Sequence, residues 1–133
     1  MTSIAETVAE LAREPQGNPK DDEGRKKPCV STIPMQTLLE VAKVMKLGAG
    51  KYGIKNYRVQ PIKASTYFDA IFRHSVDWYE GSERTNFMPQ DIDDESLAHH
   101  LAHIAACALL TLDAVQRGNL IDDRQRYEVK RPG

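Results

Sequence analysis

Glycine closes each of three long segments in which apolar residues recur at helical spacing. The segments and their closing glycines are residues 35–47 with Gly48, Gly50 and Gly53, residues 64–80 with Gly81, and residues from about 94 to 117 with Gly118. Glycine commonly ends a helix because it adopts the left-handed backbone conformation without steric cost. A chain with this pattern folds around helices, and we expect three core helices here.

The N-terminal part of the chain has a different composition. Residues 3–13 have helical spacing, and Ser3 with Glu6 has the pattern of a capping box. Residues 14–28 are dense in proline, glycine and charge, which predicts a mobile linker or a loop that orders only against a partner. The expected organisation is an N-terminal helix with its linker, a helical domain that carries the function, and a polar C-terminal tail: residues 1–29, 30–118 and 119–133.

Strand patterns are weak throughout the sequence. The nearest candidate, residues 57–65, contains Pro61, which cannot donate a hydrogen bond to a sheet. The predicted fold class is therefore all-α: a small helical bundle with three core helices plus an N-terminal helix. Three helices alone bury little apolar surface, so we expect oligomerisation, into a dimer or a tetramer, to complete the bundle.

Charge and composition argue against several classes of protein. The chain has 18 basic and 19 acidic residues and a net charge of −1, so no overall field attracts nucleic acid. No apolar run approaches the roughly 18 residues of a membrane span, and the N-terminus lacks a signal-peptide pattern. Cys29 and Cys107 are far apart and indicate neither a disulfide framework nor a zinc knuckle. We expect a cytoplasmic protein without nucleic-acid or membrane partners.

One carboxylate lies beside an apolar helical face. Glu40 is close to the apolar seam of residues 35–47 rather than in the middle of the polar face. Two interpretations remain open. Glu40 is either a rim carboxylate paired with Lys43 or Lys46, or an inward carboxylate that binds a cation, because a buried charge is costly unless it is paired or metal-bound.

A polar stripe runs along the segment 64–80. Its members are Asp69, Arg73, Asp77 and Glu80. The rest of this helix is apolar around much of its circumference, so we expect it to be largely enclosed. The stripe is then either a solvated face of weak ion pairs or a set of charges that face a cleft or an interface.

Three of the chain's four histidines occur in residues 93–103, DDESLAHHLAH. His100 and His103 lie at i, i+3 on the same helical face as Cys107, a spacing that suits two metal ligands or two packed core residues. His99 falls outside this face. Three acidic residues precede the histidines: Asp93, Asp94 and Glu95. The residues alone leave a metal or phosphate role and a structural role both open.

The glycine-rich segment 48–58, GAGKYGIKNYR, concentrates polar chemistry. It contains basic residues suited to phosphate, tyrosines that can stack on a base, and an asparagine suited to a base edge. These residues are Lys51, Lys55, Arg58, Tyr52, Tyr57 and Asn56. The alternative is an ordinary glycine-rich turn. The segment is not a P-loop, because it lacks the G-x-x-x-x-G-K-[ST] pattern.

Three segments in combination resemble a known family. They are IPMQTLLEVAKVMKLGAGKYGIKNYR (residues 33–58), YFDAIFRH (67–74) and DDESLAHHLAHIAAC (93–107). Together they resemble the phage dATP/dGTP diphosphohydrolases, including the members called MazZ, which are similar to the wider MazG-like all-α pyrophosphohydrolases. The resemblance covers about residues 30–115, so it identifies residues 30–118 as a MazG-like dNTP pyrophosphohydrolase domain.

The resemblance implies hydrolysis of purine deoxynucleoside triphosphates, dGTP and dATP, to a monophosphate and pyrophosphate. The implied cofactor is Mg²⁺, or Mn²⁺ or Co²⁺ in its place. In phages that replace adenine with 2-aminoadenine, such members lower dATP and supply dGMP. The positions that match the family pattern are Glu40, Lys51, Tyr52, Gly53, Asn56, Asp69, Arg73, His74, Glu95, Ser96, His100 and His103.

From these positions we predict roles for individual residues. The predicted catalytic residues are Glu40, Asp69, His100 and His103. The predicted metal ligands are Glu40, Asp69, Asp94 and Glu95, with Asp77 and Glu80 in reserve. The predicted substrate-binding residues are Lys51, Tyr52, Lys55, Asn56, Tyr57, Arg73 and His74. Carboxylates from separate helices would meet inside the bundle, where a bound ion would clamp the triphosphate and activate water.

The sequence departs from the family pattern at several positions. Tyr57 stands where the pattern has tryptophan, and Leu97 stands where it has glycine. Lys43 occupies the place of the second acid in the usual MazG signature, and the loop at residues 82–92 is longer. The sequence therefore leaves open which acids hold the metal.

Two other functions are alternatives to this hydrolase. A histidine-aspartate phosphohydrolase would use His74, His103 and Asp113, but the chain has no adjacent His-Asp pair. A non-catalytic helical nucleotide-binding or regulatory module would have the same pocket and would bind dNTPs without changing them. Phosphate analysis after incubation separates the second alternative from a hydrolase.

Overall fold

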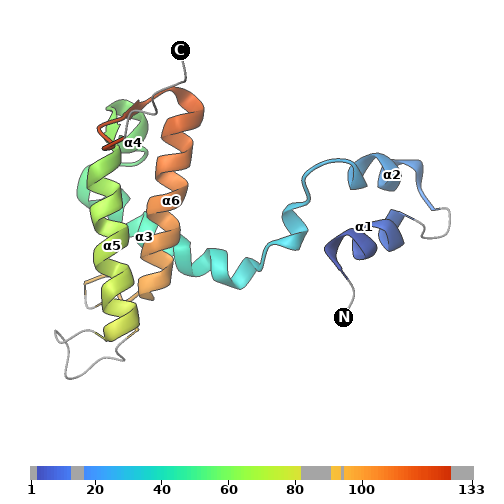
Figure 1. The fold of residues 1–133 in the computed structure, drawn as a ribbon, viewed down its shortest axis with the longest axis horizontal. Helices are drawn as coiled ribbons and strands as arrows, with labels where there is room; N and C mark the ends of the chain where they lie inside the picture. The colour runs from blue at the N-terminus through green and yellow to red at the C-terminus, as the bar shows by residue number, and fades with distance from the viewer. Residues whose placement is uncertain (1–2, 13–16, 82–90, 94, 127–133) are drawn as a thin grey trace, which may run out of the picture. The chain divides into compact units, whose positions relative to one another are not determined.

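The computed structural model describes residues 3–12, 17–81, 91–93 and 95–126. The chain divides into two compact units, Met1–Met35 and Gln36–Gly133. The first unit contains α1 (Ile4–Ala12), α2 (Pro19–Arg25) and a short 3-10 turn (Val30–Thr32) (Figure 1). The second unit contains the remaining helices and two very short strands.

The capping box predicted for the first helix is confirmed. The Ser3 amide donates to Oε2 of Glu6 and the Glu6 amide donates to Oγ of Ser3, each over 3.0 Å. Within the predicted linker over residues 14–28, residues 19–25 form α2. The Asn18 side chain accepts from the amide two residues on, and Pro19 fits the first helical turn. These local start signals outweigh the glycine and charge of the segment.

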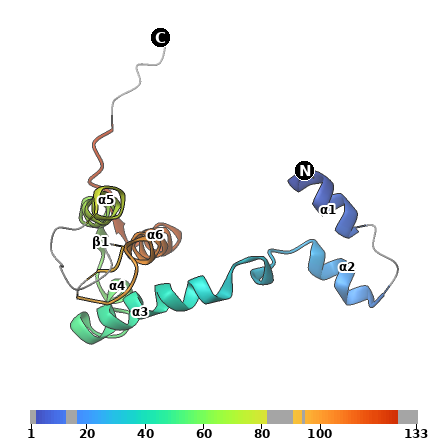
Figure 2. The same cartoon turned by 90° about the horizontal axis from the view of Figure 1, so that it is seen from below.

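Three helices form the core of the second unit, as predicted. They are α3 (Met35–Tyr52), α5 (Ala64–Glu80) and α6 (His100–Arg117), and the unit also holds α4 (Asn56–Val59), β1 (Ile62–Lys63) and β2 (Leu120–Ile121). The helices α5 and α6 run antiparallel, side by side, and α3 crosses this pair (Figures 1 and 2). Val41 of α3 packs with Ala102 and Ala106 of α6. The all-α fold class is confirmed.

The helix α3 is longer than the predicted 35–47. Gly48 lies inside it and does not end it; the helix continues to Tyr52 and stops at Gly53, whose φ is +97°. A glycine inside a helix costs only about 1 kcal/mol relative to alanine. A helix therefore stops at a glycine only where the backbone takes the conformation that glycine permits, and here that residue is Gly53.

The helix α6 begins at His100, six residues later than predicted. Oδ2 of Asp93 accepts from the amides of Glu95 and Ser96, at 3.2 and 2.9 Å, and Leu97 has φ of +58°. The Asp93 contacts would suit a helix start, but the positive φ of Leu97 and the extended backbone of His99 are incompatible with a continuous helix from residue 94. The ring of His99 then caps α6, because its Nδ1 accepts from the Leu101 amide at 3.0 Å.

The prediction of no strand is wrong at two dipeptides. β1 pairs with β2 in parallel, with Ile62 opposite Leu120, and Pro61 precedes the pairing without interrupting it. Next to this pairing, the Ser65 amide near the start of α5 donates to Oδ1 of Asp123 at 2.9 Å. The first turn of α5 is thus capped by a residue far along the chain.

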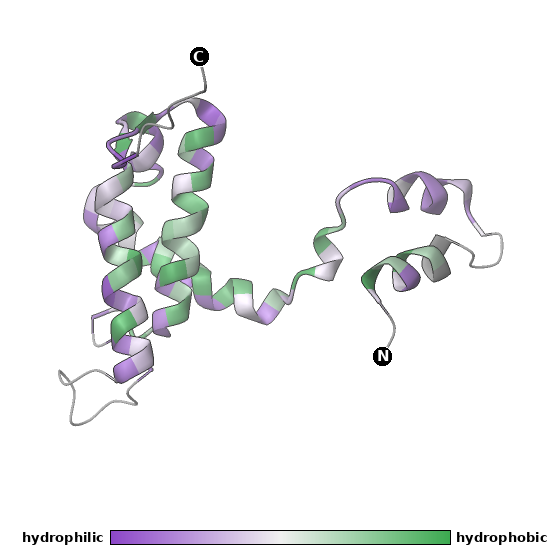
Figure 3. Ribbon diagram, viewed as in Figure 1, coloured by the Kyte–Doolittle hydropathy of each residue, from purple (hydrophilic) through white to green (hydrophobic). Residues whose placement is uncertain are grey.

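Apolar residues run along much of α6 (Figure 3). Several large apolar side chains of α5 and α6 remain exposed: Phe68, Phe72, Leu109, Leu112 and Val115. The second unit therefore has a small core and a large exposed apolar face.

Within the described ranges, no helix is both long enough and apolar enough to cross a membrane.

Candidate functional site

Three histidines from two helices meet where α6 begins. Nδ1 of His74, on α5, lies 2.9 Å from Nδ1 of His100, and the rings of His74 and His103 stack with centroids 4.1 Å apart. His100 is 2% exposed, and the other two rings are half-buried. The i, i+3 spacing on α6 and the antiparallel packing against α5 bring the three rings together. The predicted inward face of α6 is confirmed.

Two polar residues of the preceding turn contact His103. Its Nε2 lies 2.5 Å from Oγ of Ser96 and 3.5 Å from Oδ2 of Asp93. The turn is held together by the Ser96 amide, which donates to the same Asp93 oxygen. Burial alone would raise the pKa of Asp93, but hydrogen bonds from Ser96 and the adjacent histidines lower it overall. Asp93 therefore stays a carboxylate at neutral pH.

Burial keeps two of the rings uncharged. Burial, and then the neighbouring His103, lowers the pKa of His74 to about 4. Burial also lowers the pKa of His103, although Asp93 opposes this effect. Neutral imidazoles each retain one nitrogen lone pair, which can accept a proton or bind a metal ion.

Three of these side chains can hold a metal ion together. His74, Asp93 and His100 each offer one ligand atom, and the three atoms lie within 4.8 Å of one another. The sequence prediction missed Asp93 as a ligand and named Asp94, which lies outside the described residues. The acidic run at residues 93–95 was the sequence signal for this ligand. Asp93 was missed because a helix starting at residue 94 would have placed it away from the histidine cluster.

Two of the predicted acids lie beside this cluster and pair with lysines. Oε1 of Glu40 accepts from the His99 amide at 3.1 Å, and its Oε2 lies 2.9 Å from Nζ of Lys43. The Lys43 ammonium, with the His99 amide, lowers the pKa of Glu40. Glu95 forms an ion pair with Lys51, which raises the pKa of the Lys51 ammonium. Glu40 thus combines the predicted rim pairing with a contact at the start of α6.

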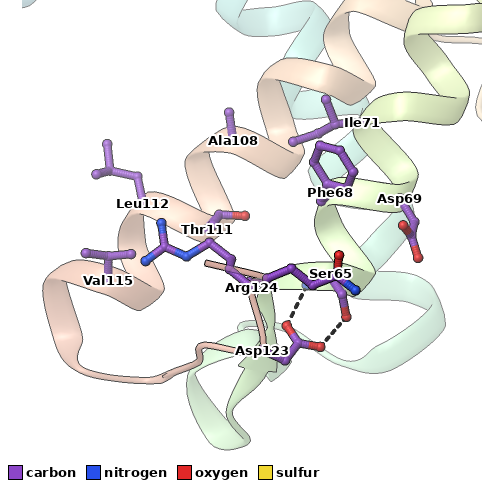
Figure 4. Close-up of a pocket in the computed structure, with 12 residues that line it drawn as sticks. Ser65, Phe68, Asp69, Ile71, Ala108, Thr111, Leu112, Val115, Asp123 and Arg124 are labelled. Atoms are coloured by element: carbon purple, nitrogen blue, oxygen red, sulfur yellow. Dashed lines mark hydrogen bonds between the residues drawn. The ribbon is translucent and has the colours of Figure 1, made fainter. Parts of the chain in front are cut away.

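Asp69 is not brought to the histidine cluster. It is five residues before His74, which places it about 140° away around α5. Asp69 is exposed and lines an apolar cavity of about 920 Å³ between α5 and α6, together with Phe68 and Leu112. In Figure 4 its carboxylate points away from Leu112, on the other side of Phe68. Arg73 and Glu80 of the same stripe are exposed, and Asp77 is half-buried.

Asn56 and Tyr57, two of the three residues predicted to bind the base, lie at the other end of α6. Lys55 precedes α4, and α4 contains Asn56 and Tyr57. Arg58 of α4 donates to Oδ1 of Asp113 at 3.0 Å. Asp113 is thirteen residues beyond the first residue of α6, or about 20 Å along the helix. Tyr57 also lines a cavity of about 260 Å³ there. Tyr52 ends α3 and is 69% exposed.

The ion pair between Arg58 and Asp113 bears on the alternative of a histidine-aspartate phosphohydrolase. That arrangement needs His74, His103 and Asp113 to share one site. Asp113 instead pairs with Arg58 and Arg117, and no contact with either histidine occurs in the part of the chain that the structure describes. The geometry does not support this alternative.

Comparisons with known proteins agree with the resemblance of the motifs. The family described as dATP/dGTP diphosphohydrolase, N-terminal, matches residues 17–124. A dATP/dGTP diphosphohydrolase of Salmonella phage PMBT28 is 33% identical over 114 residues, which is 86% of this chain and 35% of the relative. The chain thus spans about a third of the length of this curated relative. No solved structure matches the chain.

The matched range contains both helices of the histidine cluster and the turn between Asp93 and His99. It covers most of the chain, and the identity to the phage relative extends over nearly the same share. The predicted family is therefore confirmed: the chain belongs to the dATP/dGTP diphosphohydrolase N-terminal family.

Proposed function

We propose that the chain hydrolyses purine deoxynucleoside triphosphates, dGTP and dATP, to a deoxynucleoside monophosphate and pyrophosphate. The name of the Salmonella phage relative supports this activity. The main structural support is the convergence of the three family-like segments. Lys51 comes from the first, His74 from the second, and Glu95 with His103 from the third, and all four lie in or beside one cluster.

Lys51 is the best-placed cation for the triphosphate. Its ion pair with Glu95 is partly exposed, with side chains 38% and 58% accessible. Exposed ion pairs contribute about 0–1 kcal/mol, so a phosphate can displace the Glu95 carboxylate at little cost. The ammonium would then neutralise charge that develops on the leaving pyrophosphate.

His103 is the best-placed proton acceptor for the attacking water. Its neutral ring is stacked on His74, and its Nε2 faces Ser96 and Asp93. In the proposed reaction, water attacks the α- or the β-phosphorus, His103 accepts the proton, and the bond between that phosphorus and the bridging α–β oxygen breaks. The electron pair leaves with pyrophosphate if the α-phosphorus is attacked, and with the monophosphate if the β-phosphorus is attacked. Ser96 and Asp93 hold the ring in position for this transfer.

The described donor set does not fit Mg²⁺, the cofactor that the resemblance implies first. Mg²⁺ prefers six oxygen ligands and is usually held by carboxylates and water. The cluster of described residues offers two imidazoles and one carboxylate, and Glu40 and Glu95 are paired with lysines. No step is therefore assigned to Mg²⁺. The proposed dependence on a divalent ion fits Co²⁺ better than Mg²⁺ or Mn²⁺, because Co²⁺ readily accepts imidazole whereas Mn²⁺ favours oxygen ligands.

The direct test is product analysis. The chain is incubated with each dNTP and NTP, and pyrophosphate, orthophosphate and nucleotide products are measured. The expected products are dGMP and dAMP with equimolar pyrophosphate. Nucleotide that binds without turnover would instead support the non-catalytic binding module. Asp69→Ala belongs in the same assay, because unchanged turnover removes Asp69 from the predicted catalytic and metal-binding set.

Two wider parts of the proposal have separate tests. The exposed apolar side chains of α5 and α6 support a homo-oligomer, which light scattering after size-exclusion chromatography measures. The proposed site of action is the host cytoplasm, where the dNTP pool is, without membrane or nucleic-acid partners. Supply of dGMP for 2-aminoadenine DNA follows from the resemblance, and nucleoside analysis of the DNA synthesised alongside this protein tests it.

A further inference from the structure

We infer that His74, His100 and Asp93 form a binding site for one divalent transition-metal ion of the class that prefers imidazole ligands, such as Co²⁺ or Zn²⁺, and that this site discriminates against Mg²⁺. The role of the ion in turnover rests on the proposed function. Its binding rests only on the geometry of the cluster.

The ligand atoms are already at coordination distances from one another. Nδ1 of His74 and Nδ1 of His100 are 2.9 Å apart. Two imidazole nitrogens bound at right angles to one ion, each at about 2.1 Å, are about 3 Å apart. An Asp93 oxygen completes a group in which all three ligand atoms lie within 4.8 Å. An ion can enter this group with small movements of the side chains.

The buried polarity of the site favours an ion. His100 is 2% exposed, and its Nε2 is buried without a hydrogen-bond partner among the described residues. Its Nδ1 faces the Nδ1 of another imidazole, so the pair of rings forms one hydrogen bond at most. A buried imidazole with so few partners is costly. A cation bound between the two Nδ1 atoms would use both of their lone pairs, while Nε2 of His100, on the other edge of the ring, would carry the proton.

The residues around the three ligands hold them in place. Every hydrogen bond described for the Asp93 side chain ends on Oδ2, which accepts from the amides of Glu95 and Ser96. Oδ1 can therefore bind an ion while Oδ2 fixes the orientation of the carboxylate. His103 stacks on His74 with an interplanar angle of 11° and restrains that ring. Metal sites commonly depend on such outer contacts to orient their ligands.

The donor atoms determine the class of ion. Two imidazole nitrogens with one carboxylate oxygen suit Zn²⁺ and Co²⁺, whereas Mg²⁺ selects oxygen ligands. One negative carboxylate between two neutral rings also leaves open coordination positions and a net positive charge when a divalent ion is bound. Those positions can take water or phosphate oxygens.

The test is a Co²⁺ titration of the full chain, prepared without a polyhistidine tag. Visible absorption reports imidazole coordination of Co²⁺, and elemental analysis after gel filtration gives the number of ions per chain. The expected result is one Co²⁺ per chain, which a hundredfold excess of Mg²⁺ does not displace. The variants His74→Gln and Asp93→Asn should each weaken Co²⁺ binding more than about tenfold.

The matched control is His99→Asn. It removes a histidine next to the cluster, and asparagine can still accept from the Leu101 amide as a helix cap. Co²⁺ binding should be unchanged in this variant. Circular dichroism and thermal unfolding check that each variant folds. His100 is buried, so a substitution there can prevent folding. The variants His74→Gln and Asp93→Asn therefore decide the result.

The outcomes separate this inference from the proposed function. Absence of Co²⁺ binding to the wild type, or unchanged affinity in both folded variants, overturns the inference; pyrophosphate release from dGTP with Mg²⁺ would then leave the proposed function standing. One bound Co²⁺ that both variants lose supports the inference. If the same wild-type protein releases no pyrophosphate with any divalent ion, the proposed function fails and the metal site stands.

Discussion

The imidazole rings of His74 and His103 lie nearly parallel, with 11° between their planes and 4.1 Å between their centroids. The stack directs their edges to different partners. His74 faces His100, and His103 faces Ser96 and Asp93. In our proposals, His74 binds an ion and His103 accepts a proton, and the different partners of the two rings support this division.

This division predicts the effect of His103→Gln. Glutamine fills part of the space but cannot accept a proton from water, so kcat for pyrophosphate release should fall by about 100-fold, as is typical for loss of a general base. KM should change little, because Lys51 is intact. Steady-state kinetics with dGTP measures both values, with His99→Asn as the matched control. A His103→Gln enzyme with wild-type kcat would remove His103 from the reaction.

Lys51→Ala should act on substrate binding. The ammonium beside Glu95 supplies positive charge at the edge of the cluster, so its loss should raise KM for dGTP by about tenfold or more, or about 1.4 kcal/mol of binding. The fold should be retained, because the ion pair is exposed and contributes little to stability. Lys46→Ala, at another exposed lysine of α3, is the control. Equal KM values in the two variants would contradict the assignment.

Leu97→Gly should stabilise the protein. Leu97 has φ of +58°, a conformation that costs a residue with a Cβ about 1–2 kcal/mol, and it is 57% exposed, so its side chain packs little. The free energy of unfolding should rise by about 1 kcal/mol in a denaturant titration. The control is Leu101→Gly, since the same substitution inside α6 should lower stability. A loss of stability in Leu97→Gly would mean that the side chain is held by contacts that the exposed fraction does not reveal.

Acid stability should depend on Asp123. Hydrogen bonds from the Ser65 hydroxyl and amide lower the pKa of Asp123 below its usual value of 3.8. A carboxyl with a lower pKa in the folded state contributes stability above its unfolded pKa, and this contribution is lost as the pH falls through the folded pKa. Asp123→Asn should therefore flatten the fall in Tm between about pH 5 and about pH 2. Ser65→Ala should flatten it partly, because the amide still donates. An unchanged acid slope in both variants would exclude this contact.

The sequence predicted the parts of the fold that depend on local signals. The helix at 64–80 and the end of α6 at Gly118 have clear periodicity and clear stops, and both are confirmed. The start of α6 was wrong, because histidine is not a typical capping residue and the turn before it depends on Asp93. The family pattern has glycine where this chain has Leu97. The positive φ at this position explains why glycine suits it.

The candidate site was only partly predictable. The spacing of His100 and His103 identified their shared face from sequence alone. The contact with His74 depends on how α5 is rotated against α6, which one helix's periodicity does not determine. Asp69 was grouped with these residues by its motif, but a motif gives no direction around the helix, and the structure places it beside the apolar cavity. Its role stays a prediction.

The cap that Asp123 places on the first turn of α5 joins residues 58 positions apart in the chain. A helix whose opening turn is finished by so distant a residue cannot reach its full stability by local nucleation. The chain must close a long loop first, and such closure lowers the folding rate more than it lowers the final stability. Assembly of the bundle should therefore proceed from the α5–α6 contacts, where His74 and His100 are only 26 positions apart, toward the β1–β2 end, which becomes the last part of the unit to gain protection from hydrogen exchange.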